Sequence, residues 1–196
     1  MTDPGRLIAL EGMDEGMLDT VADALSAWLR ERGRRVEQTR TPTAGPAGTQ
    51  IRLHRQGRLR FDPATLALLF TADHLDHLRP PGDILAWLDA GHDVLCVRYL
   101  LFSCACLVDR VDLDWLLQIN APCRAPDLTL FVDTSPAPLA GGATGDQVGA
   151  PSRAGYGRCI DALRRAGHTI RRVEAEAPVD EVARACQREV ARWLKG

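Results

Sequence analysis

The sequence contains almost no lysine. Its 24 basic residues are 23 arginines and the single Lys195, so no second lysine is available to any site in the chain. Long apolar runs are also missing, since none approaches the roughly 20 residues that a membrane-spanning helix needs. The first residues, MTDPGR, lack the apolar segment of a signal peptide. We therefore expect a cytoplasmic protein without a membrane segment.

Concentrated charge of one sign is absent as well. The formal net charge is -2, and we interpret the densest basic cluster, RERGRR around Arg35, as the solvated end of a helix. Nucleic acid and anionic membrane surfaces are therefore not expected as partners.

Cysteine is present, but not in a pattern of paired ligands. The six cysteines include no CxxC pair, and in a cytoplasmic chain they are expected to be reduced thiols. His74 and His77 lie three residues apart on a predicted helix that also carries Asp73 and Asp76, a spacing that metal ligands can share. We expect no metal site at either place.

Strand and helix patterns alternate along the chain. Strands are predicted at residues 7–12, 35–39, 93–99, 127–134 and 168–176, and helices at residues 20–33, 51–56, 63–78, 84–91 and 179–195, with a further helix beginning near Arg153. The segments DVLCVRY and DLTLFVDT are almost continuously apolar, as buried parallel strands require. The alternation predicts a single α/β domain over residues 1–196, with a parallel sheet and helices on both faces.

Residues 135–152 interrupt this alternation. The segment, SPAPLAGGATGDQVGAPS, contains four glycines and three prolines but no arginine. Such a composition predicts a flexible loop between the fourth strand and the helix that begins near Arg153.

The segment RLIALEGMDEGMLDT, residues 6–20, has the outline of a phosphate-binding loop. An apolar strand runs into a turn containing glycine and then into an amphipathic helix. A P-loop uses a lysine to neutralise charge on the transferring phosphoryl group and a hydroxyl residue to help hold magnesium. Leu18 and Asp19 stand at those two positions. The outline therefore indicates a kinase scaffold, but the side chains do not supply the chemistry.

Five motifs, in order along the chain, resemble the thymidylate kinase family. EGMDEGMLDT resembles the family's EGxDGxGK[ST]T, TRTPTAGPAGTQIR its TREPGGTPIGExIR, LLFTADHLDHL its LLFAADRAQHL, WLDAGHDVLCVRY its AL-x-x-G-x-x-V-x-x-DRY, and PDLTLFVDTSP its PDLTLYLDVxPE. The resemblance implies a P-loop NTPase-like fold of the nucleoside monophosphate kinase type, with a five-stranded parallel sheet. It also implies a homodimer through helices packed face to face, to which the apolar helix LALLFTADHL would contribute.

The same resemblance assigns the candidate site residues. The vestigial phosphate loop would consist of Gly12, Asp14, Gly16 and Thr20. The substrate positions would be Arg40, Pro42, Phe70, His74, Arg98 and Tyr99, with Arg98 as the residual catalytic cation. We expect that Arg40, Arg52 and Arg153 could converge with Arg98 on one cleft.

The departures from the family follow the same order. In the loop, Glu15 and Met17 replace two glycines, which removes backbone freedom, and the carboxylates of Glu15 and Asp19 would repel a phosphate. Val97 replaces the acidic residue of DRY that is associated with magnesium. His74 replaces the arginine that contacts the monophosphate in relatives.

Three further positions have changed. Thr41 replaces a glutamate, the segment at residues 102–107 lacks the tyrosine and glutamine that line the thymidine pocket, and residues 135–152 lack the arginines of the family's lid. These losses predict a thymidylate kinase homologue without phosphoryl transfer, which binds nucleotide weakly or has an interaction role. No cofactor is then expected. The alternatives are a divergent kinase that uses ATP, magnesium and dTMP, and a nucleotide sensor.

Overall fold

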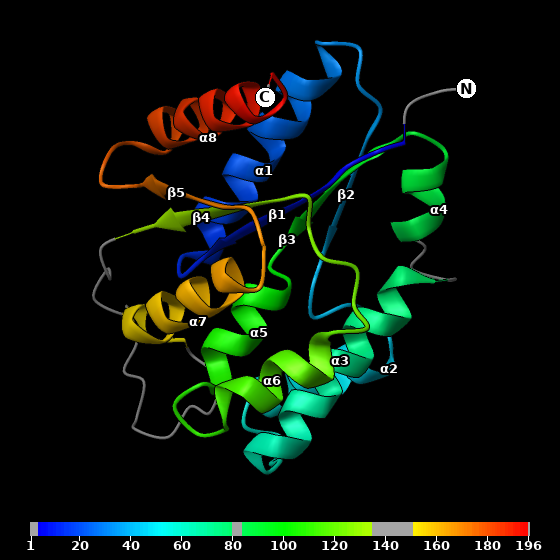
Figure 1. Ribbon diagram of the computed structural model, residues 1–196, viewed down its shortest axis with the longest axis vertical. Helices are drawn as coiled ribbons and strands as arrows, with labels where there is room; N and C mark the ends of the chain where they lie inside the picture. The colour runs from blue at the N-terminus through cyan, green and yellow to red at the C-terminus, as the bar shows by residue number, and fades with distance from the viewer. Residues whose placement is uncertain (1–3, 80–83, 135–150, 196) are drawn as a thin grey trace.

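The structure, a computed structural model, describes residues 4–79, 84–134 and 151–195 of the chain. Five parallel strands in this part form one sheet with the order β2-β3-β1-β4-β5 (Figure 1). The strands are β1 (Leu7–Gly12), β2 (Val36–Arg40), β3 (Asp93–Val97), β4 (Leu128–Asp133) and β5 (Ile170–Glu174). The predicted five-stranded parallel sheet is confirmed.

Helices connect these strands and cover both faces of the sheet. They are α1 (Glu15–Arg30), α2 (Pro46–Arg55), α3 (Pro63–Leu78), α4 (Ile84–Asp89), α5 (Leu100–Leu107), α6 (Leu113–Asn120), α7 (Arg153–Arg165) and α8 (Val179–Trp193). The sequence pattern did not predict α5 and α6. All eight residues of α5 are buried, so this helix has no polar face and shows no helical period.

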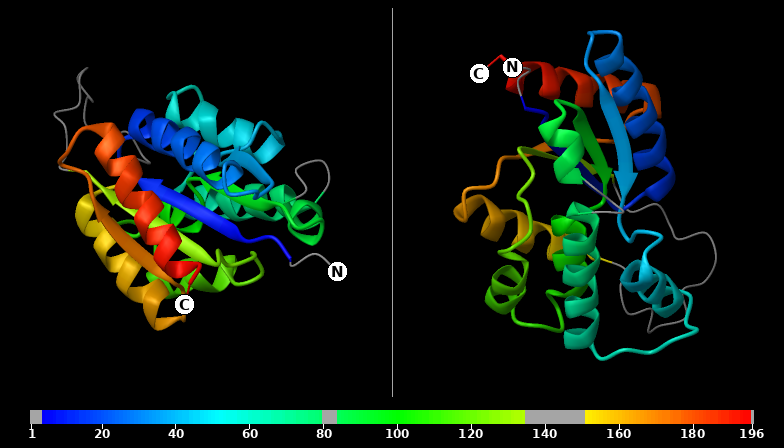
Figure 2. Two further views of the ribbon diagram at one scale, coloured as in Figure 1. Left: turned by 90° about the horizontal axis from the view of Figure 1, so that it is seen from above. Right: turned by 90° about the vertical axis from the view of Figure 1, so that its right-hand side faces the viewer.

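The sheet separates two layers of helices. Helices α1 and α8 pack together over one face, while α5 and α7 pack together on the other, with α3 and α6 against α5 (Figures 1 and 2). Strand β1 shows why both layers are needed: Ile8 and Leu10 join the core under α1 and α8, and Leu7 and Ala9 join the core on the opposite face. Full burial of each large side chain contributes about 1.5–3 kcal/mol.

The end of β3 differs from the prediction. The apolar run extends to Tyr99, but the strand ends at Val97, because Arg98 adopts a left-handed conformation with φ 61°. The Arg98 amide donates to the Leu10 carbonyl at 2.8 Å, and the Tyr99 amide donates to the Glu11 carboxylate at 2.9 Å. The chain thus turns sharply at the carboxyl edge of the sheet and enters α5.

The predicted loop at residues 135–152 lies outside the described residues, except for its last two positions. There Ser152 caps α7 by accepting a hydrogen bond from the Gly155 amide at 2.9 Å. Within the described ranges, no helix has both the length and the apolar character needed to span a membrane.

Candidate functional site

The turn between β1 and α1 lies at the carboxyl edge of the sheet, where ligands bind in open parallel folds. Helix α1 begins at Glu15, and Asp14 caps it by accepting a hydrogen bond from the Met17 amide at 3.0 Å. The Leu18 amide donates to the Asp14 carbonyl at 3.1 Å. Helix N-termini bind anions through free amides, so the chain's own carboxylate already occupies one of the amides that would face a phosphate.

Leu18 does not face the cleft. Its side chain is 1% exposed and belongs to the core between the sheet and the helices α1 and α8. Gly12 lies beside it, where an added Cβ would stand 2.7 Å from the Val132 carbonyl oxygen and 3.2 Å from Leu18. The Gly12 carbonyl accepts a hydrogen bond from the Tyr156 hydroxyl at 2.9 Å. Packing in the core therefore explains why leucine and glycine stand at these two positions.

Gly16 and Thr20 lie on the first turns of α1. The Thr20 hydroxyl is exposed and donates back to the Gly16 carbonyl at 3.1 Å. This contact is local to the helix.

The carboxylate of Glu15 lies among three arginines. It accepts a hydrogen bond from Arg98 at 2.8 Å and stands 3.6 Å from a guanidinium nitrogen of Arg40 and 3.9 Å from one of Arg55. Arg40 also contacts Asp19. The structure therefore brings together the predicted residues Arg40 and Arg98, but their partners are the carboxylates of the altered loop.

Arg98 is fixed more firmly than the other two arginines. Its side chain is 6% exposed, and its guanidinium lies 4.4 Å from the ring centre of Phe102. The Thr41 hydroxyl donates to the Arg98 carbonyl at 3.0 Å. The left-handed backbone of a residue other than glycine costs about 1–3 kcal/mol, and such residues concentrate at functional sites.

Two of the four expected arginines are used elsewhere. Arg52 donates to the carbonyl of Thr43 and to the Thr49 hydroxyl, so it fixes the loop before α2. Arg153 pairs with the buried carboxylate of Asp133 at 3.1 Å. Arg55 is not among the residues that the sequence predicts for the site; its position one helical turn after Arg52 is the only signal for it in the sequence.

The aromatic and histidine positions of the predicted substrate site are buried. Phe70 packs edge-on against Phe102 with ring centres 6.1 Å apart, and His74 lies 4.8 Å from the ring of Tyr99. The His74 Nδ1 atom is 3.4 Å from the Asn120 side-chain oxygen. Burial lowers the pKa of His74 to about 4. His74 is therefore neutral at physiological pH and does not replace the charge of the family's arginine.

The positions associated with magnesium offer little to a cation. Val97 is a core residue with 5% exposure, and the Asp19 carboxylate is paired with Arg40. Within the described ranges, no group of three His, Cys, Asp or Glu side chains is placed to hold a metal ion. The residues at this edge do not fit a magnesium–ATP complex.

Pro42 follows a cis peptide bond in the loop that also contains Thr41.

Glu11 lies on β1, and its buried carboxyl group reaches the turn just before α5. It is 0% exposed and accepts a hydrogen bond from the Tyr99 amide at 2.9 Å, while its second oxygen has no partner in the described part of the chain. Burial raises the pKa of Glu11 to about 7, although hydrogen bonds from the backbone of Tyr99 and Phe102 oppose that rise. Glu11 thus joins β1 to the turn that carries Arg98.

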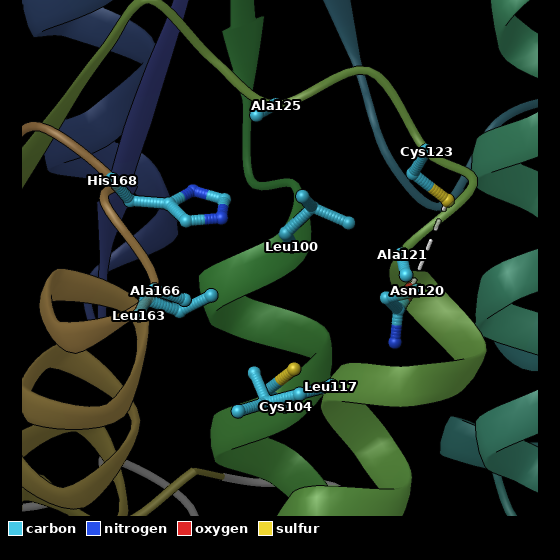
Figure 3. Close-up of a pocket in the computed structure, with 10 residues that line it drawn as sticks. All are labelled: Leu100, Cys104, Leu117, Asn120, Ala121, Cys123, Ala125, Leu163, Ala166 and His168. Atoms are coloured by element: carbon cyan, nitrogen blue, oxygen red, sulfur yellow. Dashed lines mark hydrogen bonds between the residues drawn. The ribbon is translucent and has the colours of Figure 1, made fainter.

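Two cavities differ in their relation to these residues. One of about 360 Å³ lies beside Arg40 and is lined by Asp19, Asp23 and Val97 among others. Another of about 250 Å³ lies between α5, α6 and α7, where His168 points inward toward Leu100 (Figure 3). The second cavity includes none of the residues that the sequence assigns to the loop or the substrate.

The sequence and the fold of this chain are similar to those of known thymidylate kinases. A family model described as thymidylate kinase matches residues 10–141. A probable thymidylate kinase of Pyrococcus horikoshii is 35% identical over 135 residues, which cover 66% of this chain and 65% of that protein. A thymidylate kinase of Dinoroseobacter shibae is 37% identical over 146 residues, which cover 69% of this chain and 68% of that protein. The chain thus matches less than two thirds of the length of the Pyrococcus relative.

A solved structure extends the likeness to the whole fold. Thymidylate kinase from Candida albicans superposes with a TM-score of 0.75 at 20% sequence identity, covering 96% of this chain and 92% of that one. At this identity the match establishes the fold alone.

Proposed function

The chain belongs to the thymidylate kinase family, and we propose that it is a member without phosphoryl transfer. The observation that carries the proposal is the position of Leu18. This residue stands where the family has the lysine that neutralises the transferring phosphoryl group, and it is packed in the core with 1% exposure. Since Lys195 is the only lysine, the donor phosphates would meet no lysine at this loop.

Three further contacts support the same proposal. Asp14 caps the helix that would receive phosphate, and Glu15 holds Arg98. Val97, in place of an acidic residue, is buried among apolar side chains. Phosphoryl transfer depends almost entirely on positioning and on stabilising charge, so losses at the loop, the metal position and the acceptor position reinforce one another.

One observation favours a second candidate, a divergent kinase or a nucleotide sensor. Arg98 has a buried side chain and a left-handed backbone, and residues with such backbone strain concentrate at active sites and ligand-binding sites. In that case Arg98 would be the principal cation for the phosphate of dTMP.

Binding of magnesium–ATP tests the proposed function. We expect wild-type protein to bind ATP with a dissociation constant weaker than about 1 mM, because Glu15 and Asp19 add negative charge at the loop and Leu18 adds no positive charge. Isothermal titration calorimetry with and without magnesium measures this. Micromolar binding that requires magnesium would contradict the proposal and favour the divergent kinase.

The family's homodimer is also proposed for this chain. Leu68 on α3 is 51% exposed, the most exposed large apolar side chain in the described part of the chain. It belongs to the apolar helix that the sequence predicts at the dimer contact. A second copy packing against α3 would cover it.

Substitution Leu68→Glu is expected to weaken this dimer at least about tenfold, because it places a charge in an apolar contact. Sedimentation equilibrium measures the change. Leu59→Glu is the matched control, since Leu59 is 37% exposed but lies outside α3. Equal masses for wild type and Leu68→Glu across the concentration series would refute a contact through α3.

A further inference from the structure

The cavity of about 250 Å³ between α5, α6 and α7 lies on the far side of α5 from the predicted substrate positions (Figure 3). Leu100 and Cys104, one helical turn apart on α5, both line it. Phe102 lies between them in sequence and packs instead against Phe70 and Arg98. Helix α5 therefore separates this cavity from the altered loop and from Arg98.

The wall of the cavity is uncharged. Three leucines, three alanines and two cysteines form most of it, and none of the described residues that line it is charged. Burial raises the pKa of Cys123 to about 11 and that of Cys104 still further, so both thiols stay protonated. Burying an unpaired charge is far more costly than burying a neutral group. The cavity therefore favours a neutral molecule and disfavours a phosphate or a nucleotide.

The volume of the cavity limits the size of that molecule. An engineered apolar cavity of about 150 Å³ in another protein binds benzene, whereas sites for drug-sized ligands measure roughly 300–1,000 Å³. A cavity of about 250 Å³ thus matches a single ring with a short substituent. Ala121 and Ala166 are exposed, so small side chains stand where the cavity meets solvent and leave a path for entry.

His168 supplies the polar contact. Its ring points inward toward Leu100 (Figure 3), and no described residue forms a hydrogen bond with that ring. Burial lowers the pKa of His168, so near pH 7 the neutral imidazole has one donor and one acceptor nitrogen. The Asn120 amide, in contrast, accepts from the Thr71 hydroxyl at 3.3 Å and donates to the Leu116 carbonyl at 2.9 Å. The open hydrogen-bonding capacity at His168 matches a ligand with one hydroxyl group.

We propose that this cavity binds a neutral aromatic alcohol of one ring, a phenol, whose ring packs against Leu100, Leu117 and Leu163 and whose hydroxyl group hydrogen-bonds to His168. The inference goes beyond the proposed function, because neither the altered loop nor Arg98 takes part. Water is the competing occupant. Displacement of poorly ordered water by an apolar ring favours binding.

Phenol itself is the probe for this site. We expect wild-type protein to bind it with a dissociation constant of about 0.1–1 mM, within the limit for so small a ligand. Calorimetry measures the affinity, and the NMR signals of the His168 ring should shift as phenol is added. Phenyl phosphate carries the same ring with a charge, and it should not bind over the same concentration range.

A cavity-filling variant locates the binding. Ala166→Leu places a larger side chain at the exposed C-cap of α7, beside the cavity, and should weaken phenol binding at least about tenfold. Ala154→Leu is the matched control, because it makes the same change at an exposed position at the start of α7, outside the cavity lining. Its affinity for phenol should stay within about twofold of wild type.

The variant His168→Phe tests the hydrogen bond. It keeps a ring at this position but removes both nitrogens, so phenol should bind about fivefold more weakly or worse. Toluene, which has no hydroxyl group, should bind this variant and the wild type within about twofold of each other. Equal losses for phenol and toluene would show that the ring packs and does not pair.

Three results would overturn the proposal. One is the absence of phenol binding by the wild type up to about 10 mM, since water would then be the occupant. The others are an equal loss of affinity in Ala166→Leu and Ala154→Leu, and binding of phenyl phosphate as tight as that of phenol. None of them bears on the absence of phosphoryl transfer, because that is measured by turnover of the wild type.

Discussion

Restoring the phosphate loop is expected to raise affinity for magnesium–ATP by about a hundredfold or more. The variant carries Glu15→Gly, Met17→Gly, Leu18→Lys and Asp19→Ser. It removes two carboxylates and adds one lysine, and each hydrogen bond to a charged group contributes about 1.5–3 kcal/mol. Calorimetry measures the binding. Phosphorylation of dTMP should stay low, because Val97 and neutral His74 remain.

The four-residue variant should be less stable than the wild type. Leu18 is part of the core, and removal of a buried leucine side chain costs about 2–5 kcal/mol. A lower thermal midpoint is therefore expected for the four-residue variant. The triple variant that retains Leu18 is the control: it should keep more of the stability and gain less affinity. Full kinase activity in the four-residue variant would show that the losses outside the loop matter little.

The second large effect concerns the dependence of stability on pH. Burial raises the pKa of Glu11 from 4.5 to about 7, so the folded protein holds this proton more tightly than the unfolded chain does. The resulting stabilisation is fully present below pH 4.5 and is lost as the pH rises through 7, in total about 3 kcal/mol. Glu11→Gln stays neutral and keeps an oxygen for the Tyr99 amide, so this loss should disappear.

Urea unfolding of wild type and Glu11→Gln at a series of pH values between 4.5 and 8 measures the difference. Glu181→Gln, which changes an exposed carboxyl at the start of α8, controls for surface charge and should follow the wild-type curve. If Glu11→Gln also follows that curve, Glu11 is not titrating in this range.

The sheet could be predicted because its central strands are buried on both faces. DVLCVRY and DLTLFVDT are apolar almost throughout, and this pattern needs no knowledge of neighbours. Helix α5 was not predicted, because a helix that is buried on every side shows no helical period of apolar and polar residues. The strand end at Val97 depends on the left-handed turn at Arg98, and nothing in the local sequence marks that turn.

The losses in the site were visible in the sequence, but the contacts that replaced them were not. Leu18 and Asp19 can be compared with a motif position by position. Glu15 and Arg98 are separated by 83 positions, so their ion pair arises only when β1 and β3 pair. Which arginine of α2 faces Glu15 depends on how that helix packs, and it is Arg55 and not Arg52.

His74 is another residue whose position, but not its environment, could be predicted from the sequence. Its place on α3 followed from the sequence, but its neutral state follows from complete burial, which lowers the pKa of His74 more than the contact with Asn120, 46 positions away on α6, raises it. Desolvation of this kind is a property of packing.

The most direct test of lost phosphoryl transfer is dTMP-dependent formation of ADP by the wild-type protein supplied with ATP and magnesium. A kinase of ordinary activity turns over about 1–100 times per second. We predict no ADP above the background measured without dTMP, because the charge of the loop lysine and the acidic magnesium position are both absent. A turnover number within the kinase range would contradict this account and identify the chain as a divergent thymidylate kinase.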